Sequence, residues 1–305
     1  MDVMERYKDC HLCPRACGVD RTVGKRGYCR ASSTAHVAYH MLHKWEEPCL
    51  VGENGSGTIF FAGCGLGCVY CQNSAISQKE CGRPYSSDAL ATLFLSLERK
   101  GAANINLVTA AHYAPHLVIA IQKARDEGLS LPIVYNTSGF EAEETLCMLK
   151  DYIDVYLTDM RYGSAKTAKR YSGAEAYPTV ALSALSQMVK QVGGLSYNER
   201  GELVKGVVVR FLLLPTHLIE AKQNLKRVFS LFGNSVIYSL MSQYTPMKDL
   251  PAFPELSERV SAYEYASFVS YARDLGITNA FVQEGEAASS SFIPPFECAL
   301  HEGDT

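Results

Sequence analysis

Three cysteines stand at short spacing in one glycine-rich stretch: Cys64, Cys68 and Cys71 form a C-x3-C-x2-C pattern. An apolar run over residues 58–62 directly precedes them and predicts a buried strand. The glycines between the cysteines let the backbone curl, so that three sulfurs can converge on one object. Closely spaced thiolates bind zinc, copper(I) or iron–sulfur clusters. Three ligands, rather than the four of a structural zinc site, favour a four-iron cluster with one iron open for chemistry.

A second group of cysteines lies near the start of the chain. Cys10, Cys13, Cys17 and Cys29 follow a C-x2-C-x3-C-x11-C pattern with few large apolar side chains between them. Such a segment cannot form a core of its own, whereas a bound metal would convert binding energy into folding energy. Zinc and a second iron–sulfur cluster both accept four thiolates, and both alternatives stay open. We therefore expect a metal-binding segment and linker over residues 1–50.

Composition limits the class of protein. The chain has 305 residues, of which 47% are hydrophobic and 20% charged, which suits one large α/β domain with a small appendage. A net charge of −3 argues against nucleic acid and anionic membranes as partners. We find no signal peptide and no apolar run that could span a bilayer. Eleven cysteines in that context favour a reducing cytoplasm and metal sites.

Strand and helix patterns alternate along the rest of the chain. Residues 46–49 and 52–57 predict loops leading into the first strand, and Ser261 with Glu264 predicts a capping box for the last helix. Near-continuous apolar strands alternating with helices predict a parallel sheet covered by helices, here a curved, partly open barrel of about six units. The further strands are expected at 105–108, 133–135, 155–157, 207–214, 236–240 and 280–282.

Polar residues follow most of these strands. Ligands of parallel α/β folds bind at the carboxyl ends of the strands, so we expect these residues to share one mouth with the cysteine loop. The polar clusters are 109–112, 136–138, 159–161, 242–243 and 283–284.

The cysteine pattern after a first strand, with Tyr70 just before the last cysteine, resembles the signature of radical S-adenosylmethionine (radical SAM) enzymes. Over nearly its whole length the chain resembles the uncharacterised relatives of pyruvate formate-lyase activating enzyme. The resemblance implies a partial (β/α)6 barrel over residues 51–305, a 4Fe-4S cluster on the three cysteines and S-adenosylmethionine bound to the open iron. The matching stretches are 10–15, 55–61, 104–109, 135–139, 242–247 and 292–294.

The resemblance also implies contacts to the cofactor. Most members have Gly-Gly-Glu where this chain has Thr109 to His112, and there the motif meets the cofactor's amino group. Thr109 offers a hydroxyl or a carbonyl; His112 is either a cofactor contact or a packed histidine. Tyr70 would pack near the adenine or in the core.

Further contacts are implied at the next two strand ends. Asn136, Thr137 and Asp159 match positions that hold a monovalent cation beside the cofactor carboxylate in the activating enzymes, and Ser138 belongs to the same matching stretch. Arg161 replaces a lysine and would neutralise that carboxylate with its planar fork. The alternative for Asp159 and Arg161 is a solvated ion pair.

Two residues on later strands complete the predicted site. Arg210 lies inside an apolar strand, where a buried arginine needs a partner. It faces cofactor or substrate, or it pairs with Glu284. Gln243 and Glu284 are expected at the mouth from their strand-end positions.

Three functions follow from these expectations. The first is an enzyme that cleaves S-adenosylmethionine to a 5′-deoxyadenosyl radical and abstracts hydrogen, which by resemblance activates a partner glycyl radical enzyme. The second is radical modification of a peptide, a protein or a small molecule, with the N-terminal cysteines gripping substrate or relaying electrons. The third is a metal-stabilised adaptor without catalysis, suggested by the missing Gly-Gly-Glu. The resemblance implies a reductant of the flavodoxin or ferredoxin type.

Overall fold

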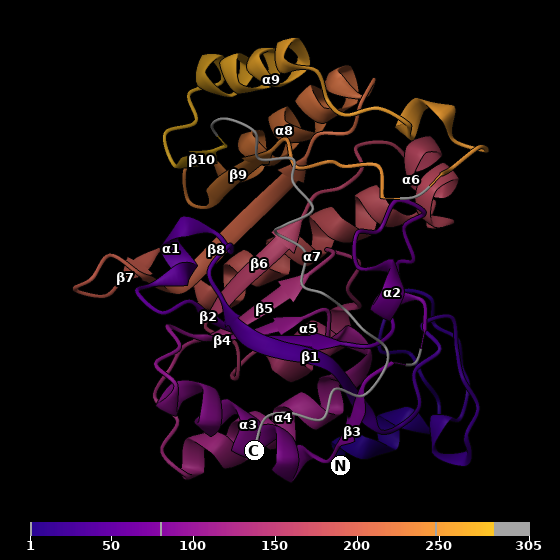
Figure 1. Cartoon of the computed structure of the whole chain (residues 1–305), viewed down its shortest axis with the longest axis vertical. Coiled ribbons are helices and arrows are strands. Elements are labelled where there is room, and N and C mark those ends of the chain that lie inside the picture. The colour runs from indigo at the N-terminus through magenta and orange to yellow at the C-terminus, as the bar shows by residue number, and fades with distance from the viewer. Residues whose placement is uncertain (1, 80, 248, 284–305) are drawn as a thin grey trace.

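An open β-sheet covered by helices forms the centre of the computed structural model, which describes residues 2–79, 81–247 and 249–283 (Figure 1). The strands are β1 (Ala35–His43), β2 (Ser56–Phe61), β3 (Arg83–Tyr85), β4 (Ile105–Val108), β5 (Ile133–Thr137), β6 (Val155–Asp159), β7 (Ser196–Tyr197), β8 (Leu203–Leu212), β9 (Ile237–Met241) and β10 (Ala280–Val282). The helices are α1 (Pro48–Val51), α2 (Ser74–Ser77), α3 (Ser87–Arg99), α4 (Ala114–Asp126), α5 (Glu143–Leu149), α6 (Ala165–Ser172), α7 (Tyr177–Val192), α8 (Leu218–Phe232) and α9 (Ala262–Asp274).

The strand order confirms the predicted fold class. In the described part of the chain the order is β10-β9-β8-β6-β5-β4-β2-β1-β3, with β7 on β8. Neighbouring strands from β2 to β10 along this path are parallel, and the path does not close on itself. Figure 1 shows α3 and α4 beside one end of the sheet and α8 and α9 beside the other. Alternating strands and helices thus form a partial barrel.

Local sequence signals explain where the helices begin. The Ser86 hydroxyl accepts a hydrogen bond from the Ala89 amide at 3.1 Å and caps α3. The predicted capping box is present in α9, where Ser261 and Glu264 satisfy each other's backbone amides. α3 then buries Leu90 and Phe94 against the sheet, the amphipathic pattern that keeps such a helix in place. Among the described residues, no helix combines the length and the apolar character needed to cross a bilayer.

The structure corrects three sequence predictions. The approach to the first parallel strand contains β1, a nine-residue strand that pairs antiparallel with β2. Only part of β1 is buried, so its sequence contains no continuous apolar run that would predict a strand. β8 begins at Leu203 rather than at Val207 and ends at Leu212. Pro48 and Cys49, predicted to lie in a loop, belong to α1. Glu284 and the stretch 292–294 lie outside the described residues.

The carboxyl ends of β5 and β6 are held together by a close approach at Gly139. The Tyr177 hydroxyl lies 2.7 Å from the Ser138 carbonyl oxygen and 2.9 Å from the Asp159 carbonyl oxygen. Gly139 has a φ of +77°, and a Cβ there would lie 2.4 Å from the Asp159 carbonyl oxygen. Only glycine therefore fits at this turn.

We expect Gly139→Ala to destabilise the protein by about 3 kcal/mol, because a left-handed backbone and a backbone clash act together. Gly173→Ala is the matched control, since Gly173 has a φ of +56° but no atom within 4 Å of the added Cβ. It should lose only about 1 kcal/mol. Urea denaturation of both variants measures the difference; equal losses would mean that no close approach exists at Gly139.

Candidate functional site

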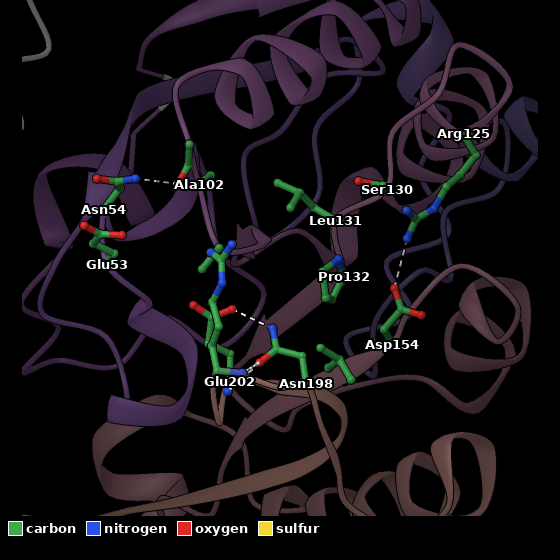
Figure 2. Close-up of a pocket in the computed structure, with 14 residues that line it drawn as sticks. Glu53, Asn54, Ala102, Arg125, Ser130, Leu131, Pro132, Asp154, Asn198 and Glu202 are labelled. Atoms are coloured by element: carbon green, nitrogen blue, oxygen red, sulfur yellow. Dashed lines mark hydrogen bonds and ion pairs between the residues drawn. The ribbon is translucent and has the colours of Figure 1, made fainter.

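Polar side chains line two cavities at opposite ends of the parallel strands. The first lies at the amino ends and is shown in Figure 2. There Arg125 points to Asp154 with a nitrogen–oxygen distance of 3.0 Å, and the Asn198 amide donates to Glu202 at 2.7 Å. These groups satisfy one another, and amino-end polar residues of such folds serve stability. We assign this cavity a structural role.

The second cavity, of about 840 Å³, opens on the concave face toward the carboxyl strand ends. Gln72 and Asn73, which follow the last cysteine of the loop, also line it, so it adjoins the cysteine motif. The predicted site residues that line it are Thr109, Asn136, Thr137, Asp159, Arg161, Arg210 and Gln243. These residues are far apart in the sequence and share one cavity, as expected where the carboxyl ends of parallel strands meet.

Tyr70 does not line this cavity. It is 6% exposed, and its ring packs edge-on against Tyr162, Tyr171 and Tyr244, with centroid distances of 6.0 to 6.4 Å. Tyr70 therefore turns from the cysteine loop into a cluster of buried tyrosines.

His112 and Ser138 also lie outside the cavity lining. His112 Nε2 lies 2.8 Å from the Ala62 carbonyl oxygen, and its own carbonyl accepts a hydrogen bond from Arg21 at 2.6 Å. Burial, together with the charge of Arg21, lowers the pKa of His112 to about 3, so the ring is neutral. The Ser138 carbonyl accepts the bond from Tyr177. Both residues support the frame of the site.

A buried ion cluster joins three strands at the centre of the cavity. Asp159 accepts hydrogen bonds from Arg210 at 2.7 Å and from Arg161 at 2.5 Å. Arg210 also donates to the Asn136 side-chain oxygen at 2.7 Å. Burial raises the pKa of Asp159, but Arg161 and Arg210 outweigh it and hold this pKa below its ordinary value. The carboxyl is therefore charged, and the pair of Asp159 and Arg161 is not a solvated surface pair.

One donor in this cluster is left over. Arg161 Nε is buried and has no hydrogen-bond partner among the described residues. Because Arg161 lines the cavity, its guanidinium lies beside any carboxylate or carbonyl of a ligand bound there. A guanidinium recognises a carboxylate through paired N–H donors, which suits the cofactor contact predicted for Arg161.

Sequence reasoning missed two acidic residues between β1 and α1. Glu46 accepts hydrogen bonds from Asn106 at 2.8 Å and from Asn136 at 3.1 Å, and its other oxygen lies 3.5 Å from Arg210. Glu47 lines the same cavity and is 8% exposed. Two adjacent glutamates just before Pro48 were visible in the sequence, but nothing placed that loop inside the barrel.

Burial raises the pKa of Glu47 to about 7; Arg210 lowers it and Glu46 raises it further. The folded protein therefore retains this proton up to about pH 7, whereas the unfolded chain loses it near pH 4.3. Because the folded state binds more protons in this window, the contribution of Glu47 to stability falls as the pH rises from about 4.3 to 7.

We expect Glu47→Gln to remove this pH dependence. Relative to the variant, the wild type should lose on the order of 3 kcal/mol of unfolding free energy between pH 5 and pH 8. Urea denaturation of anaerobically prepared protein at both pH values measures it, with Glu199→Gln on the exposed β7–β8 connection as control. Parallel pH profiles for the wild type and Glu47→Gln would contradict the assignment.

The cysteine loop provides the donor set that an iron–sulfur cluster needs. Gly63 and Gly67 have φ values of +86° and +67°, which turn the loop after β2. Burial, with Cys71 and Cys68 nearby, raises the pKa of the Cys64 thiol to about 12, so a cluster would have to displace its proton. No group of three or more His, Cys, Asp or Glu side chains in the described ranges is arranged to hold a single metal ion.

Hydrogen bonds to the sulfurs fit a cluster at this loop. The Leu66 amide lies 3.4 Å from the Cys64 sulfur, and the Ser172 hydroxyl lies 3.2 Å from the Cys68 sulfur. Ser77 reaches the Cys71 sulfur at 3.4 Å. Such bonds are among the features by which proteins tune the potential of iron–sulfur clusters.

The N-terminal cysteine segment packs directly on the cysteine loop, beside α2 in Figure 1. Arg15 donates hydrogen bonds to the carbonyl oxygens of Gly65 at 2.9 Å and Leu66 at 3.1 Å, and to Ser172 and Gly173 at 2.7 Å each. Its guanidinium carbon lies 3.8 Å from the centre of the Tyr28 ring. One side chain thus ties the two segments together.

Of the four N-terminal thiols, Cys13 lies against the cysteine loop. Cys10 and Cys29 are buried, and Cys13 and Cys17 are half-buried free thiols. A Cβ on Gly65 would lie 3.1 Å from the Cys13 sulfur. The Tyr28 amide lies 3.3 Å from the Cys17 sulfur, and Arg21 lies 3.8 Å from the Cys10 sulfur. Two cysteine groups are therefore neighbours in space.

We expect Arg15→Ala to loosen this contact, because backbone carbonyls lose a charged donor. The loss of unfolding free energy should be about 2–3 kcal/mol, with faster amide exchange over residues 8–30 and 64–68. Arg6→Ala is the control, since Arg6 forms only an exposed ion pair with Glu144 and should change stability by less than about 1 kcal/mol. Unchanged exchange in Arg15→Ala would show that the segment is held elsewhere.

Known proteins resemble this chain in sequence and in fold. Residues 58–189, which include most of β2, the cysteine loop and β3 to β6, match the family model of the Radical SAM superfamily. An uncharacterized protein of Methanocaldococcus jannaschii is 28% identical over 265 residues, covering 85% of this chain and 72% of that protein.

Two solved structures resemble the fold. A radical SAM methyltransferase from Sphaerobacter thermophilus has a TM-score of 0.54 at 15% identity, covering 75% of this chain and 66% of that one. SuiB of Streptococcus suis, solved bound to its precursor peptide SuiA, has a TM-score of 0.45 at 11% identity, covering 71% of this chain and 46% of that one. The chain thus spans about two thirds of the first and under half of the second. At these identities the likeness to the methyltransferase concerns the fold alone.

Proposed function

Because this chain carries a radical SAM domain over residues 58–189, we propose that it is an enzyme that binds a 4Fe-4S cluster at Cys64, Cys68 and Cys71 and S-adenosylmethionine in the adjoining cavity. When bound, this pair supplies a 5′-deoxyadenosyl radical that abstracts hydrogen from a substrate. The observation that carries the proposal is the single cavity that joins the cysteine loop to the polar strand ends.

The chain's own residues would orient the cofactor in this cavity. The free Nε donor of Arg161 suits a carboxylate, and Asp159 holds that arginine in place through its hydrogen bond. Thr109, which lines the cavity, would offer its hydroxyl or carbonyl to the cofactor's amino group in place of the missing Gly-Gly-Glu. Asn136 and Thr137 lie beside the ion cluster, and Gln243 accepts a hydrogen bond at its carbonyl from Gln72 of the cysteine loop at 3.2 Å.

Among radical SAM reactions, the polar cavity favours modification of a small molecule or of a peptide or protein side chain. A cavity of about 840 Å³ has the volume of a site for small ligands. Activation of a glycyl radical enzyme remains the resemblance-led alternative, and it requires a partner protein. An adaptor without catalysis would have no need of an ion cluster with a free donor.

We further propose that Cys10, Cys13, Cys17 and Cys29 hold zinc or a second iron–sulfur cluster over the proposed 1–50 segment. The packing of Cys13 against Gly65 supports an auxiliary cluster that relays electrons from a flavodoxin- or ferredoxin-type reductant to the cysteine loop. The same contact suits a zinc knuckle that braces the loop. The composition supports a cytoplasmic location for the enzyme. It also supports partners that are neither nucleic acids nor membranes.

Cysteine variants test both proposals. Reconstituted without oxygen and supplied with dithionite, the wild type should produce 5′-deoxyadenosine, whereas Cys64→Ala should lose at least about a thousandfold in rate because its cluster lacks a ligand. Cys10→Ala should still cleave S-adenosylmethionine with dithionite. Iron and zinc content and electron paramagnetic resonance of each preparation provide the second measurement.

The outcomes separate the alternatives. An auxiliary relay predicts that Cys10→Ala is slow only when a flavodoxin-type protein replaces dithionite, together with lowered iron content. A zinc knuckle predicts lowered zinc with equal rates for both reductants. A wild type that contains its cluster yet yields no 5′-deoxyadenosine would favour the adaptor.

A further inference from the structure

When Glu47 is ionised, the buried groups of the cavity carry more negative than positive charge. Three carboxylates face it, from Glu46, Glu47 and Asp159, against the two guanidiniums of Arg161 and Arg210. Both arginines are paired with Asp159, and Arg210 is also 3.5 Å from Glu46. One carboxylate is therefore left without a counter-charge.

Glu47 is the carboxylate left over. It forms no ion pair with any residue in the described ranges, although it is 8% exposed, lines the cavity between β1 and α1 and is hydrogen-bonded to Ser239. Lys44 also lines the cavity, but its side chain is exposed and forms no ion pair with the described residues either. A buried carboxylate without a cation is unfavourable, and a ligand that brings a cation removes that penalty.

His43 provides an independent observation at the same part of the cavity. It is 9% exposed and lines the cavity, yet its Nδ1 has no hydrogen-bond partner within the part of the chain that the structure describes. Burial lowers the pKa of His43, which leaves the ring neutral. A neutral imidazole nitrogen can accept a hydrogen bond. The side chains of Glu47 and His43 therefore both favour a ligand group that carries several N–H donors.

We propose that His43, Glu46 and Glu47 form a subsite for a protonated primary amine of the substrate. An ammonium group has three N–H donors and no acceptor, which matches two carboxylates and one ring nitrogen. The subsite rests on the proposed function in one respect, namely that the molecule bearing the amine is the one that loses hydrogen. Binding of the amine itself does not depend on that reaction.

The subsite adjoins the proposed cofactor contacts, because Glu46 accepts a hydrogen bond from Asn136 and lies 3.5 Å from Arg210, but it comes from another part of the chain. Glu46 and Glu47 come from the segment that follows β1, whereas Gln72, Thr109 and Arg161 come from the cysteine loop and the carboxyl strand ends. The substrate amine would therefore lie beside the segment that follows β1, with the rest of the substrate extending toward the cysteine loop. The amino group of S-adenosylmethionine is the competing occupant that an experiment has to exclude.

The single tryptophan of the chain offers a direct readout. Trp45 is flanked by Lys44 and Glu46, lines the cavity and is 62% exposed. Its fluorescence should therefore respond to a molecule that binds at this subsite. The probe is n-pentylamine, with pentan-1-ol as its neutral counterpart of the same length, added to anaerobically reconstituted full-length protein.

We expect n-pentylamine to change Trp45 emission saturably and pentan-1-ol to have no effect at the same concentrations. Glu47→Gln should weaken amine binding at least about tenfold, because a charge-assisted hydrogen bond is lost. Glu47→Asp, which keeps the charge, should retain binding within a few fold. The exposed control Glu199→Gln should bind like the wild type.

Three results would overturn the inference: equal responses to amine and alcohol, unchanged amine binding in Glu47→Gln, or a raised KM for S-adenosylmethionine in Glu47→Gln during dithionite-driven cleavage. The last would assign the carboxylate to the cofactor. The protein could also bind the amine through Glu47 and yet fail to cleave S-adenosylmethionine. That result would support the subsite and contradict the proposed function.

Discussion

A carboxylate held between two guanidiniums sets the geometry of the cavity. Asp159 ends β6, Arg210 comes from the neighbouring β8 and Arg161 follows Asp159 after one residue. Arg210 also reaches Asn136 on β5 and Glu46 beyond β1, so one network spans four segments of the chain. In a low-dielectric interior such a network persists only when its members are paired, which fixes each side chain in one orientation.

Hydrogen bonds beneath that network fix the backbone at the ends of β5 and β6. The Tyr177 hydroxyl joins the carbonyls of Ser138 and Asp159 and accepts the Arg161 amide at 3.0 Å. The ends of β5 and β6 therefore cannot separate without breaking several hydrogen bonds. On the other flank, Arg15 ties the N-terminal segment to the cysteine loop, where Cys13 lies against Gly65. A preorganised frame of this kind is what cofactor chemistry requires from the protein.

Sequence reasoning reached the barrel because its strands are buried on both faces and read as apolar runs. It reached Asn136, Asp159 and Arg161 because strand ends in parallel sheets converge. It failed at β1, whose partial burial leaves no apolar run, and with it at Glu46 and Glu47, because their position depends on where that strand ends in space. The family resemblance suggested Tyr70 and His112 as contacts, yet local packing places both outside the cavity lining.

Part of the cavity lining comes from outside the parallel barrel, namely from the end of β1 and the segment that follows it. β1 is hydrogen-bonded to β2 on one side and to β3 on the other, so the segment that follows it starts from an anchored strand rather than from a loose lid. Its four residues, 44–47, belong to no strand of the parallel barrel, although Glu46 accepts hydrogen bonds from Asn106 on β4 and Asn136 on β5. Exchange of this short connection can therefore change the lining of the cavity while every strand of the parallel barrel keeps its sequence.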